Sequence, residues 1–365
     1  MRPTIINGHE RPVNQVIYNR EGDLILTAGS DRIVNVWYSD NGERLGTLGI
    51  SSDNPKDRIE GQHRAAIWSV DITRNSLKAV TGSADPSVKI WDVSNGKPIQ
   101  SFDKDNCPSL GSSIRSVQFS LDGNLIACTQ DRQMTFYNKV NIIDIRSQDI
   151  VQSWRISNEM MMNTQIKWGF MDQNIFTGNE KGIIQKWDQR MCPTGNTEEV
   201  GEAIYSWKAH DNKITDLQLN KDRLLLASSS KDKKVIVWDA LSEECDLLKE
   251  IEHPTNANSC SFCPNKDHIA VGGGEESSKV TTSASSGHFE TYLYNIITEE
   301  KIGMFKGHFS TINTVAFHPK GHQITTGGEE GNARINNLDR NYLEYKEPEM
   351  ELVMENPEYM PVESY

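Results

Sequence analysis

A histidine recurs in this chain at a fixed distance from an acidic residue and an aromatic one. In each of four copies a carboxylate follows 22 positions after the histidine, and in three of them a tryptophan follows six positions later still. The four sets are His9, Asp31 and Trp37; His63, Asp85 and Trp91; His210, Asp232 and Trp238; and His308, Glu330 and Asn336. A spacing kept over four copies indicates that the chain is an array of similar structural units.

The sequence between these anchors alternates apolar and polar residues with the period of a β-strand. Runs such as "VNQVIYN" and "ITDLQLN" are followed by a turn and then by short apolar runs such as "LILTA" and "LLLAS". Each unit is therefore predicted to hold three or four short antiparallel strands. Weaker copies place Ile143, Trp187 and Tyr294 in the aromatic position, which brings the number of units to seven.

The recurring side chains have a structural explanation. In the second unit we expect Asp85 in a turn, Trp91 on the following strand and His63 in the loop that enters the unit. The carboxylate then accepts a hydrogen bond from the imidazole, and a strand hydroxyl such as Ser83 joins the imidazole to the indole. A histidine beside an acid is also typical of catalysis, but its repetition favours a buried network that stabilises each unit.

The Gly-His and Trp-Asp pairs of this chain resemble the marks of WD40 repeats, as at Gly8-His9 and Trp91-Asp92. The resemblance implies an all-β fold, a seven-bladed WD40 β-propeller over residues 1–346. The last unit offers only three strands, so residues 2–6 are predicted to complete the seventh blade and close the ring. Residues 342–346 are the rival for that position. Insertions such as "MCPTGNTEEVGEA" are predicted to decorate the rim.

Charge and composition exclude several classes of protein. A formal net charge of −13 opposes unspecific attraction to nucleic-acid phosphates. We find no apolar run of about 18 residues, so no membrane span is predicted. The chain begins without a secretory signal, and its six scattered cysteines are expected to be reduced, which together favour a cytoplasmic location.

The end of the chain differs in composition from the rest. Residues 347–365 hold six glutamates and no lysine or arginine. This segment is predicted to be an acidic, disordered tail, because it cannot bury enough apolar surface to offset the entropy of ordering. A partner-binding peptide that contains Tyr359 and Tyr365 is the alternative.

Three sequence features suggest a cofactor or metal, and each is better explained by the repeat. The stretch "GGGEESSKVTTSASSGHFE" lacks the Gly-Lys-Ser/Thr end and the following helix of a phosphate loop, so it is predicted to be an exposed hairpin. Cys260 and Cys263 lack a second pair at zinc-finger spacing. His318 and His322 lie near His308, which the repeat network already uses. We therefore expect no cofactor, no metal and no catalytic site.

The same glycine-rich stretch carries the most specific resemblance. Together with "GHERPVNQVIYNREGDLILT", "VTGSADPSVKIWD" and "KGHFSTINTVAFHPKGHQITTGGEEGNARI", its order and spacing closely resemble subunit i of eukaryotic translation initiation factor 3. The resemblance covers residues 1 to about 346 and is thin from about 103 to 205.

That resemblance implies a non-catalytic, cytoplasmic scaffold, monomeric when isolated. It implies binding to the C-terminal part of subunit b and the N-terminal part of subunit g. It also implies a role in 43S preinitiation complex assembly, mRNA recruitment and scanning, with an indirect contact to the small ribosomal subunit and none to a membrane.

The family's contact with subunit b implies a surface on the fifth and sixth blades. The candidate partner-binding residues there are Lys213, Asp216, Lys231, Lys233, Glu275, Glu276 and Lys279. Since Asp232 is also a structural anchor, Asp216 is expected to be the cleaner probe: reversing the charges of Asp216 and Lys213 should weaken the complex and leave the melting temperature unchanged.

Two other classes compete with this assignment. A different WD40 scaffold, such as a receptor-associated adaptor or a ubiquitin-ligase substrate receptor, would lack the glycine-rich block. A propeller enzyme would need ionisable groups that converge on the central channel beyond those of the repeat.

Overall fold

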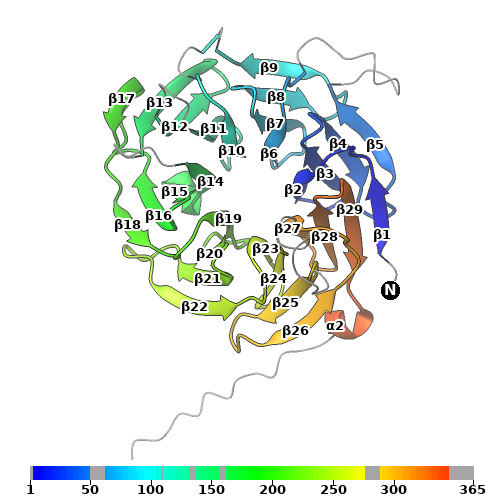
Figure 1. The fold of residues 1–365 in the computed structure, drawn as a ribbon. Helices are drawn as coiled ribbons and strands as arrows, with labels where there is room; N and C mark the ends of the chain where they lie inside the picture. Colours follow the sequence, from blue (N-terminus) through cyan, green and yellow to red (C-terminus); the bar gives the residue numbers. More distant parts are fainter. Residues whose placement is uncertain are drawn as a thin grey trace, which may run out of the picture.

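The computed structural model describes residues 3–49, 62–104, 106–107, 110–131, 137–156, 162–275 and 288–344. These residues form seven sheets arranged in a ring, and Figure 1 shows one strand of each sheet facing the middle of the ring. The predicted all-β, seven-bladed propeller is therefore confirmed.

The first three blades follow each other along the chain. Blade one holds β2 (Val13–Tyr18), β3 (Leu24–Gly29), β4 (Val34–Tyr38) and β5 (Arg44–Leu48). Blade two holds β6 (Ile67–Ile72), β7 (Lys78–Ser83), β8 (Val88–Asp92) and β9 (Pro98–Phe102). Blade three holds β10 (Ile114–Phe119), β11 (Leu125–Gln130), β12 (Lys139–Asp144) and β13 (Asp149–Arg155).

The next three blades repeat this order from the inside outward. Blade four holds β14 (Asn163–Trp168), β15 (Asn174–Asn179), β16 (Ile183–Asp188) and β18 (Tyr205–Lys208), with a 3-10 turn, η1, at Phe170–Asp172. Blade five holds β19 (Ile214–Leu219), β20 (Leu225–Ser230), β21 (Lys234–Asp239) and β22 (Leu247–Glu252). Blade six holds β23 (Ala257–Phe262), β24 (His268–Gly273), β25 (Thr291–Asn295) and β26 (Lys301–Phe305).

The seventh blade closes the ring with strands from both ends of the chain. It holds β27 (Ile312–Phe317), β28 (Gln323–Gly328), β29 (Asn332–Asn337) and, as its outer strand, β1 (Thr4–Asn7). Strand β1 runs antiparallel to β29, with Thr4 opposite Ile335 and Asn7 opposite Asn332. The N-terminal segment therefore supplies the closing strand, as predicted.

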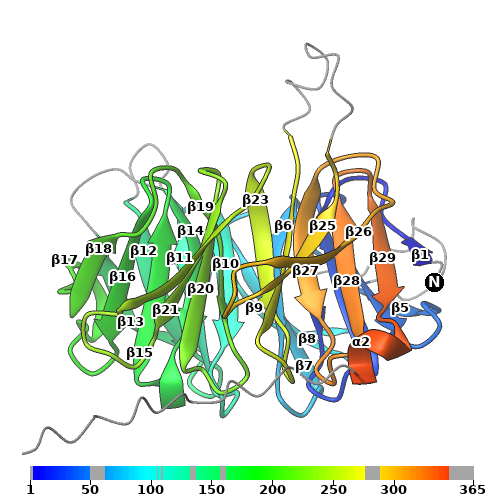
Figure 2. The same ribbon diagram turned by 90° about the horizontal axis from the view of Figure 1, so that it is seen from below.

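The rival segment forms a helix instead. Residues 340–344 make the short helix α2 (Arg340–Glu344), which lies beside blades six and seven at one face of the ring (Figure 2). The hydroxyl of Tyr342 lies 2.8 Å from Nδ1 of His268, and its carbonyl accepts a hydrogen bond from Lys266. Tyr342 thus anchors α2 to blade six.

One insertion does more than decorate the rim. Gly195–Val200, inside the "MCPTGNTEEVGEA" segment, forms β17, which pairs in parallel with β13 and gives blade three a fifth strand. The prediction that this insertion only decorates the rim is wrong. Because the outer strand of a blade has unpaired backbone groups, an adjacent extended segment can pair with it.

The core lies between blades. Between blades one and two, for example, Leu26 and Val36 pack against Ile67, Val70 and Trp91, and Trp91 is only 2% exposed. Both faces of a blade pack against neighbouring blades. The second strands, such as β3 and β7, are therefore buried along almost their whole length. Each blade therefore depends on its neighbours for its core.

The structure bears on two of the predictions, one about the cysteines and one about membrane spans. All six cysteines are buried and free. In the part of the chain that the structure describes, no helix has the length and apolar character needed to cross a bilayer.

Candidate functional site: buried relays and the channel mouth

A chain of four side chains runs through blade two. The indole nitrogen of Trp91 donates to Oγ1 of Thr81 over 2.8 Å, and the same hydroxyl lies 2.6 Å from Nε2 of His63. Nδ1 of His63 is 3.0 Å from a carboxylate oxygen of Asp85. Every polar group of this relay has a partner, as a buried network requires.

The hydroxyl in this relay is not the one the sequence suggested. Ser83 instead donates to the carbonyl oxygens of Ala65 and Ala66 and accepts from the backbone N–H of Asp85. Thr81 and Ser83 share one face of β7, because residues two apart on a strand point the same way. The prediction of Ser83 is wrong because only Thr81 is within reach of both His63 and Trp91, whereas Ser83, at the end of the strand, contacts the backbone of the entering loop.

Blades one, five and seven repeat the geometry. In blade one His9 contacts Asp31 at 3.0 Å and Thr27 at 2.8 Å, and Trp37 donates to Thr27. In blade five His210 contacts Asp232 at 2.9 Å and Ser228 at 2.7 Å, and Trp238 donates to Ser228. In blade seven His308 contacts Glu330 at 2.9 Å and Thr326 at 2.7 Å, with Asn336 in place of the indole.

Burial favours the neutral imidazole of two relay histidines, His63 and His308. It lowers the pKa of His63, an effect that the hydrogen bond and charge of Asp85 only partly offset, and it likewise lowers the pKa of His308 beside Glu330. Burial also disfavours the charged form of Asp85, but the hydrogen bonds from His63 and Ser87 outweigh it and hold the pKa of that carboxyl below its usual range. A neutral imidazole that donates through Nδ1 and accepts through Nε2 satisfies the geometry.

The sequence analysis missed a fifth histidine at the same position of the repeat. His253 stands 18 residues before Val271, as His63 stands 18 residues before Thr81, and Glu275 follows at the acidic position. Nδ1 of His253 lies 3.1 Å from the hydroxyl of Tyr294, the residue in the aromatic position. The insertion that separates β24 from β25 moves Tyr294 out of register in the sequence, which concealed the copy.

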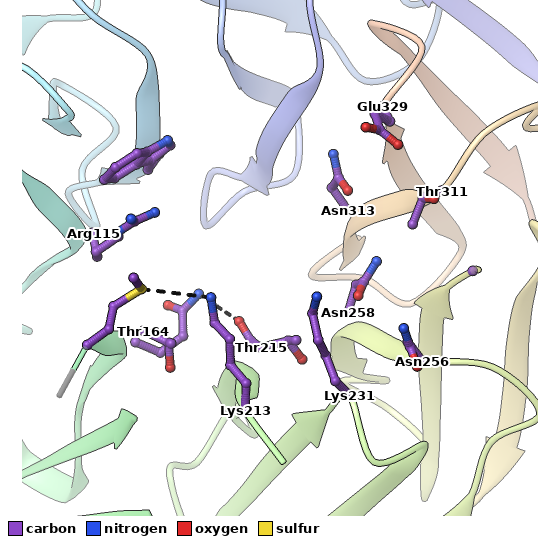
Figure 3. Close-up of a pocket in the computed structure, with 14 residues that line it drawn as sticks. Arg115, Thr164, Lys213, Thr215, Lys231, Asn256, Asn258, Thr311, Asn313 and Glu329 are labelled. Atoms are coloured by element: carbon purple, nitrogen blue, oxygen red, sulfur yellow. Dashed lines mark hydrogen bonds between the residues drawn. The ribbon is translucent and has the colours of Figure 1, made fainter. Parts of the chain in front are cut away.

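A second repeated feature surrounds the central channel. Each innermost strand has a β-bulge at its second residue, so that one side chain per blade turns toward the axis. The seven bulged residues are Asn14, Trp68, Arg115, Thr164, Thr215, Asn258 and Asn313. All but Asn14 line one cavity of about 460 Å³, shown in Figure 3 and called the channel mouth below.

On one side of the mouth the bulged side chains join neighbouring blades. Asn258 donates to the carbonyl of Ile312 over 2.9 Å, and Asn313 donates to that of Val13 over 3.1 Å. Thr215 likewise donates to the carbonyl of Ala257 in blade six, and Asn14 donates to that of Ile67 in blade two. These bonds cross the junctions from blade five through blade seven to blade two.

On the other side Thr164 donates to the carbonyl of Gly178 in its own blade, and the two remaining bulged residues are Trp68 and Arg115, an aromatic ring and a cation. The guanidinium of Arg115 lies 3.5 Å from the centre of the Trp68 ring, and its Nε donates to Asp131 over 2.9 Å. Lys213 and Lys231 line the same cavity from blade five. Burial lowers the pKa of Lys213, and the positive charges of Arg115 and Lys231 lower it further.

The structure separates the residues proposed for partner binding. Lys213 and Lys231 line the channel mouth, Lys233 is exposed in the turn between β20 and β21, and Glu275 is half-buried at the end of the described part of its loop. Glu276 and Lys279 lie outside the described residues.

Asp216 does not belong to this surface. It is 6% exposed and accepts hydrogen bonds from Ser259 over 2.7 Å and from Gln218, and burial raises its pKa. The expectation that Asp216 is a clean surface probe is wrong, because the third residue of each innermost strand points into the contact with the next blade. Ser69, Ser116 and Ser259 make the equivalent contacts.

The alternative ligand sites can also be placed. Gly272 and Gly273 lie in β24, and residues 276–287 are outside the described residues. Cys260 and Cys263 are buried, and the hydroxyl of Tyr342 contacts the sulfur of Cys263. Across the described ranges no three histidine, cysteine, aspartate or glutamate side chains form a group suited to a metal ion.

Fold and repeat together define the class: a WD40-type β-propeller whose recurring histidines serve the interior of the blades. The chain belongs to the family of eukaryotic translation initiation factor 3 subunit I, since the family model EIF3I matches residues 1–348.

Curated relatives agree along nearly the whole length. The chain is 36% identical over 353 residues to that subunit from Bombyx mori, covering 94% of this chain and 98% of the relative. It is 36% identical over 352 residues to the Rattus norvegicus subunit and 35% identical over 352 residues to the Homo sapiens subunit, each time covering 95% of this chain and 99% of the relative.

Proposed function

We propose that this chain is a non-catalytic scaffold subunit of eukaryotic translation initiation factor 3. Its family consists of subunits of that factor, so its partners are other subunits of the complex and its process is translation initiation. The observation that carries the proposal is the colinear match over about 95% of both chains, which leaves no large part of either unaccounted for.

The finer part of the proposal names the partners. We infer that the propeller binds the C-terminal part of subunit b and the N-terminal part of subunit g in the cytoplasm. In this way it supports 43S complex assembly, mRNA recruitment and scanning, and it meets the small ribosomal subunit indirectly. A closed ring is suited to this task, because a partner segment can lie across adjacent blades without disturbing them.

The proposed subunit b surface lies on blades five and six. With Asp216 buried, it consists of Lys213, Lys231, Lys233 and Glu275, together with Glu276 and Lys279 from the undescribed loop. Of the four described residues, Lys233 in the turn between β20 and β21 is exposed and the other three are half-buried.

A pulldown of the purified chain with the C-terminal segment of subunit b from the same organism tests the proposal. We expect one-to-one binding at moderate salt that weakens at high salt. Lys233→Glu should weaken it about tenfold without a change in melting temperature. Lys221→Glu, with the same charge change at the opposite end of β20, is the matched control.

The outcomes separate the levels of the proposal. Binding that Lys233→Glu leaves intact would reject the surface and keep the partner. No binding by a correctly folded propeller would reject subunit b as a direct partner. If the chain captures subunit g alone, its contact with the complex would lie outside the proposed subunit b surface.

A further inference from the structure

We propose that the channel mouth binds an acidic peptide segment of a protein partner, with carboxylates held between Arg115 and Lys213. This goes beyond membership of the initiation factor, because it gives a ligand chemistry to a cavity that shares only Lys213 and Lys231 with the proposed subunit b surface. Figure 3 shows Arg115, Lys213 and Lys231 directed toward one opening from blades three and five.

The first argument is charge. In a chain with a net charge of −13, three cations line one cavity, and the pKa of Lys213 there is lowered first by burial and then by the charges of Arg115 and Lys231. The acidic groups near them are Asp131, which binds Arg115, with Glu180 and Glu329. An incoming carboxylate would relieve the repulsion between Lys213, Lys231 and Arg115.

The second argument is shape. The mouth has the volume of a site for a few side chains, about 460 Å³, and the Trp68 ring under Arg115 adds an apolar wall. Across the opening from Arg115 and Lys213 stand the amides of Asn256, Asn258 and Asn313 (Figure 3), whose polar atoms match those of a peptide backbone.

The third argument favours a peptide over a nucleic acid. Polyphosphate binding needs a positive surface that extends beyond one cavity, and the overall field of this protein is negative. A short peptide segment with a few carboxylates can make its charge contacts with Arg115, Lys213 and Lys231 alone. The bulges that place Trp68 and Arg115 at the axis are backbone features, so the site exists before the ligand arrives.

Fluorescence anisotropy with the full chain tests this proposal. The probe is a short fluorescein-labelled peptide in which glutamates alternate with leucines, and the control peptide has glutamine at every glutamate. We expect the glutamate peptide to bind at least about tenfold more tightly, and added salt to weaken it.

Variants locate the site. The double variant Lys213→Gln with Lys231→Gln should weaken binding at least about tenfold. Lys221→Gln with Lys320→Gln removes the same charge from exposed turns and should leave affinity unchanged. Trp68→Ala is a second probe that removes no charge, and circular dichroism checks that each variant is folded.

Three results would overturn the proposal: equal affinity for the two peptides, equal loss in the two double variants, or tighter binding of labelled oligouridylate with the same dependence on Lys213 and Lys231. Trp68 lies outside the blade five and six surface. Loss of peptide binding in Trp68→Ala with intact subunit b capture would therefore separate this site from the proposed partner surface.

Discussion

Blades two and six fill the same repeat position in different ways. In blade two the imidazole of His63 lies between Thr81 and an acid, and the hydroxyl continues to Trp91. In blade six Val271 replaces the hydroxyl residue, and Nδ1 of His253 turns to the phenol of Tyr294. Among the described residues Nε2 of His253 is buried without a hydrogen-bond partner.

The difference shows that a buried histidine can keep its place in the repeat with a different set of hydrogen bonds. His253 lies against the rings of Tyr292 and Tyr294 at centroid distances of 5.0 and 6.1 Å, so aromatic packing replaces part of the polar network. Burial lowers the pKa of His253 to about 4, with Lys301 adding to the effect. Protonation of His253 in acid should therefore destabilise blade six.

The largest effect is expected from breaking the blade two relay. Thr81→Val keeps the shape of the side chain but leaves the indole N–H of Trp91 and Nε2 of His63 without the hydroxyl they share. Two unsatisfied buried groups should cost about 4 kcal/mol of unfolding free energy, measured by urea denaturation. Thr81→Ser retains the hydroxyl and serves as the control; an equal loss in both variants would contradict the relay.

Acid should expose the weakness of blade six. The unfolded chain protonates His253 near pH 6.5, whereas the folded chain does so only near pH 4. Stability from this residue is thus present above about pH 6.5 and falls as the pH drops toward 4, by up to about 3 kcal/mol. Denaturation of the wild type and of His253→Gln at several pH values measures the slope.

The His253→Gln variant should show a shallower decline than the wild type. Replacing the exposed His288 with glutamine should leave the slope as it is. Identical slopes in wild type and His253→Gln would show that other groups control acid unfolding, with His63 and His308, which also have lowered pKa values, the first to examine.

The smallest effect comes from making blade six resemble blade two. Val271→Thr introduces a hydroxyl at the position where Thr81 meets the imidazole, and it should raise the unfolding free energy by about 1 kcal/mol by giving Nε2 of His253 a partner. The same change at Val237, buried on β21, should instead destabilise, since no histidine relay reaches it. Destabilisation by both would reject the analogy.

Much of the fold could be predicted from the sequence because the repeat is local. The offset from His63 to Asp85 and Trp91 specifies a strand, a turn and a strand, and seven such units require a ring. The closing strand at Thr4–Asn7 was likewise predictable, because the last unit was one strand short. The fifth strand of blade three was not, since pairing of β17 with β13 depends on where a long insertion folds back.

The partner surface was harder to predict for the same reason. Lys233 and Asp216 look equally polar in the sequence, yet one is exposed and the other lies buried against Ser259 of the next blade. Which side of an innermost strand meets its neighbour depends on the bulge at its second residue, and a bulge leaves no reliable mark in the sequence.

The sequence by itself determined the number of blades, the relay positions and the family of this protein, because these follow from spacings between residues of one unit. Only the tertiary structure decided that Thr81 is the relay hydroxyl, that Asp216 is buried, and that Trp68, Arg115 and Lys213 meet at one opening. Those facts concern contacts between residues on different blades, or on different strands and loops of one blade. Such contacts are fixed by how the blades pack, which is a property of the closed ring as a whole.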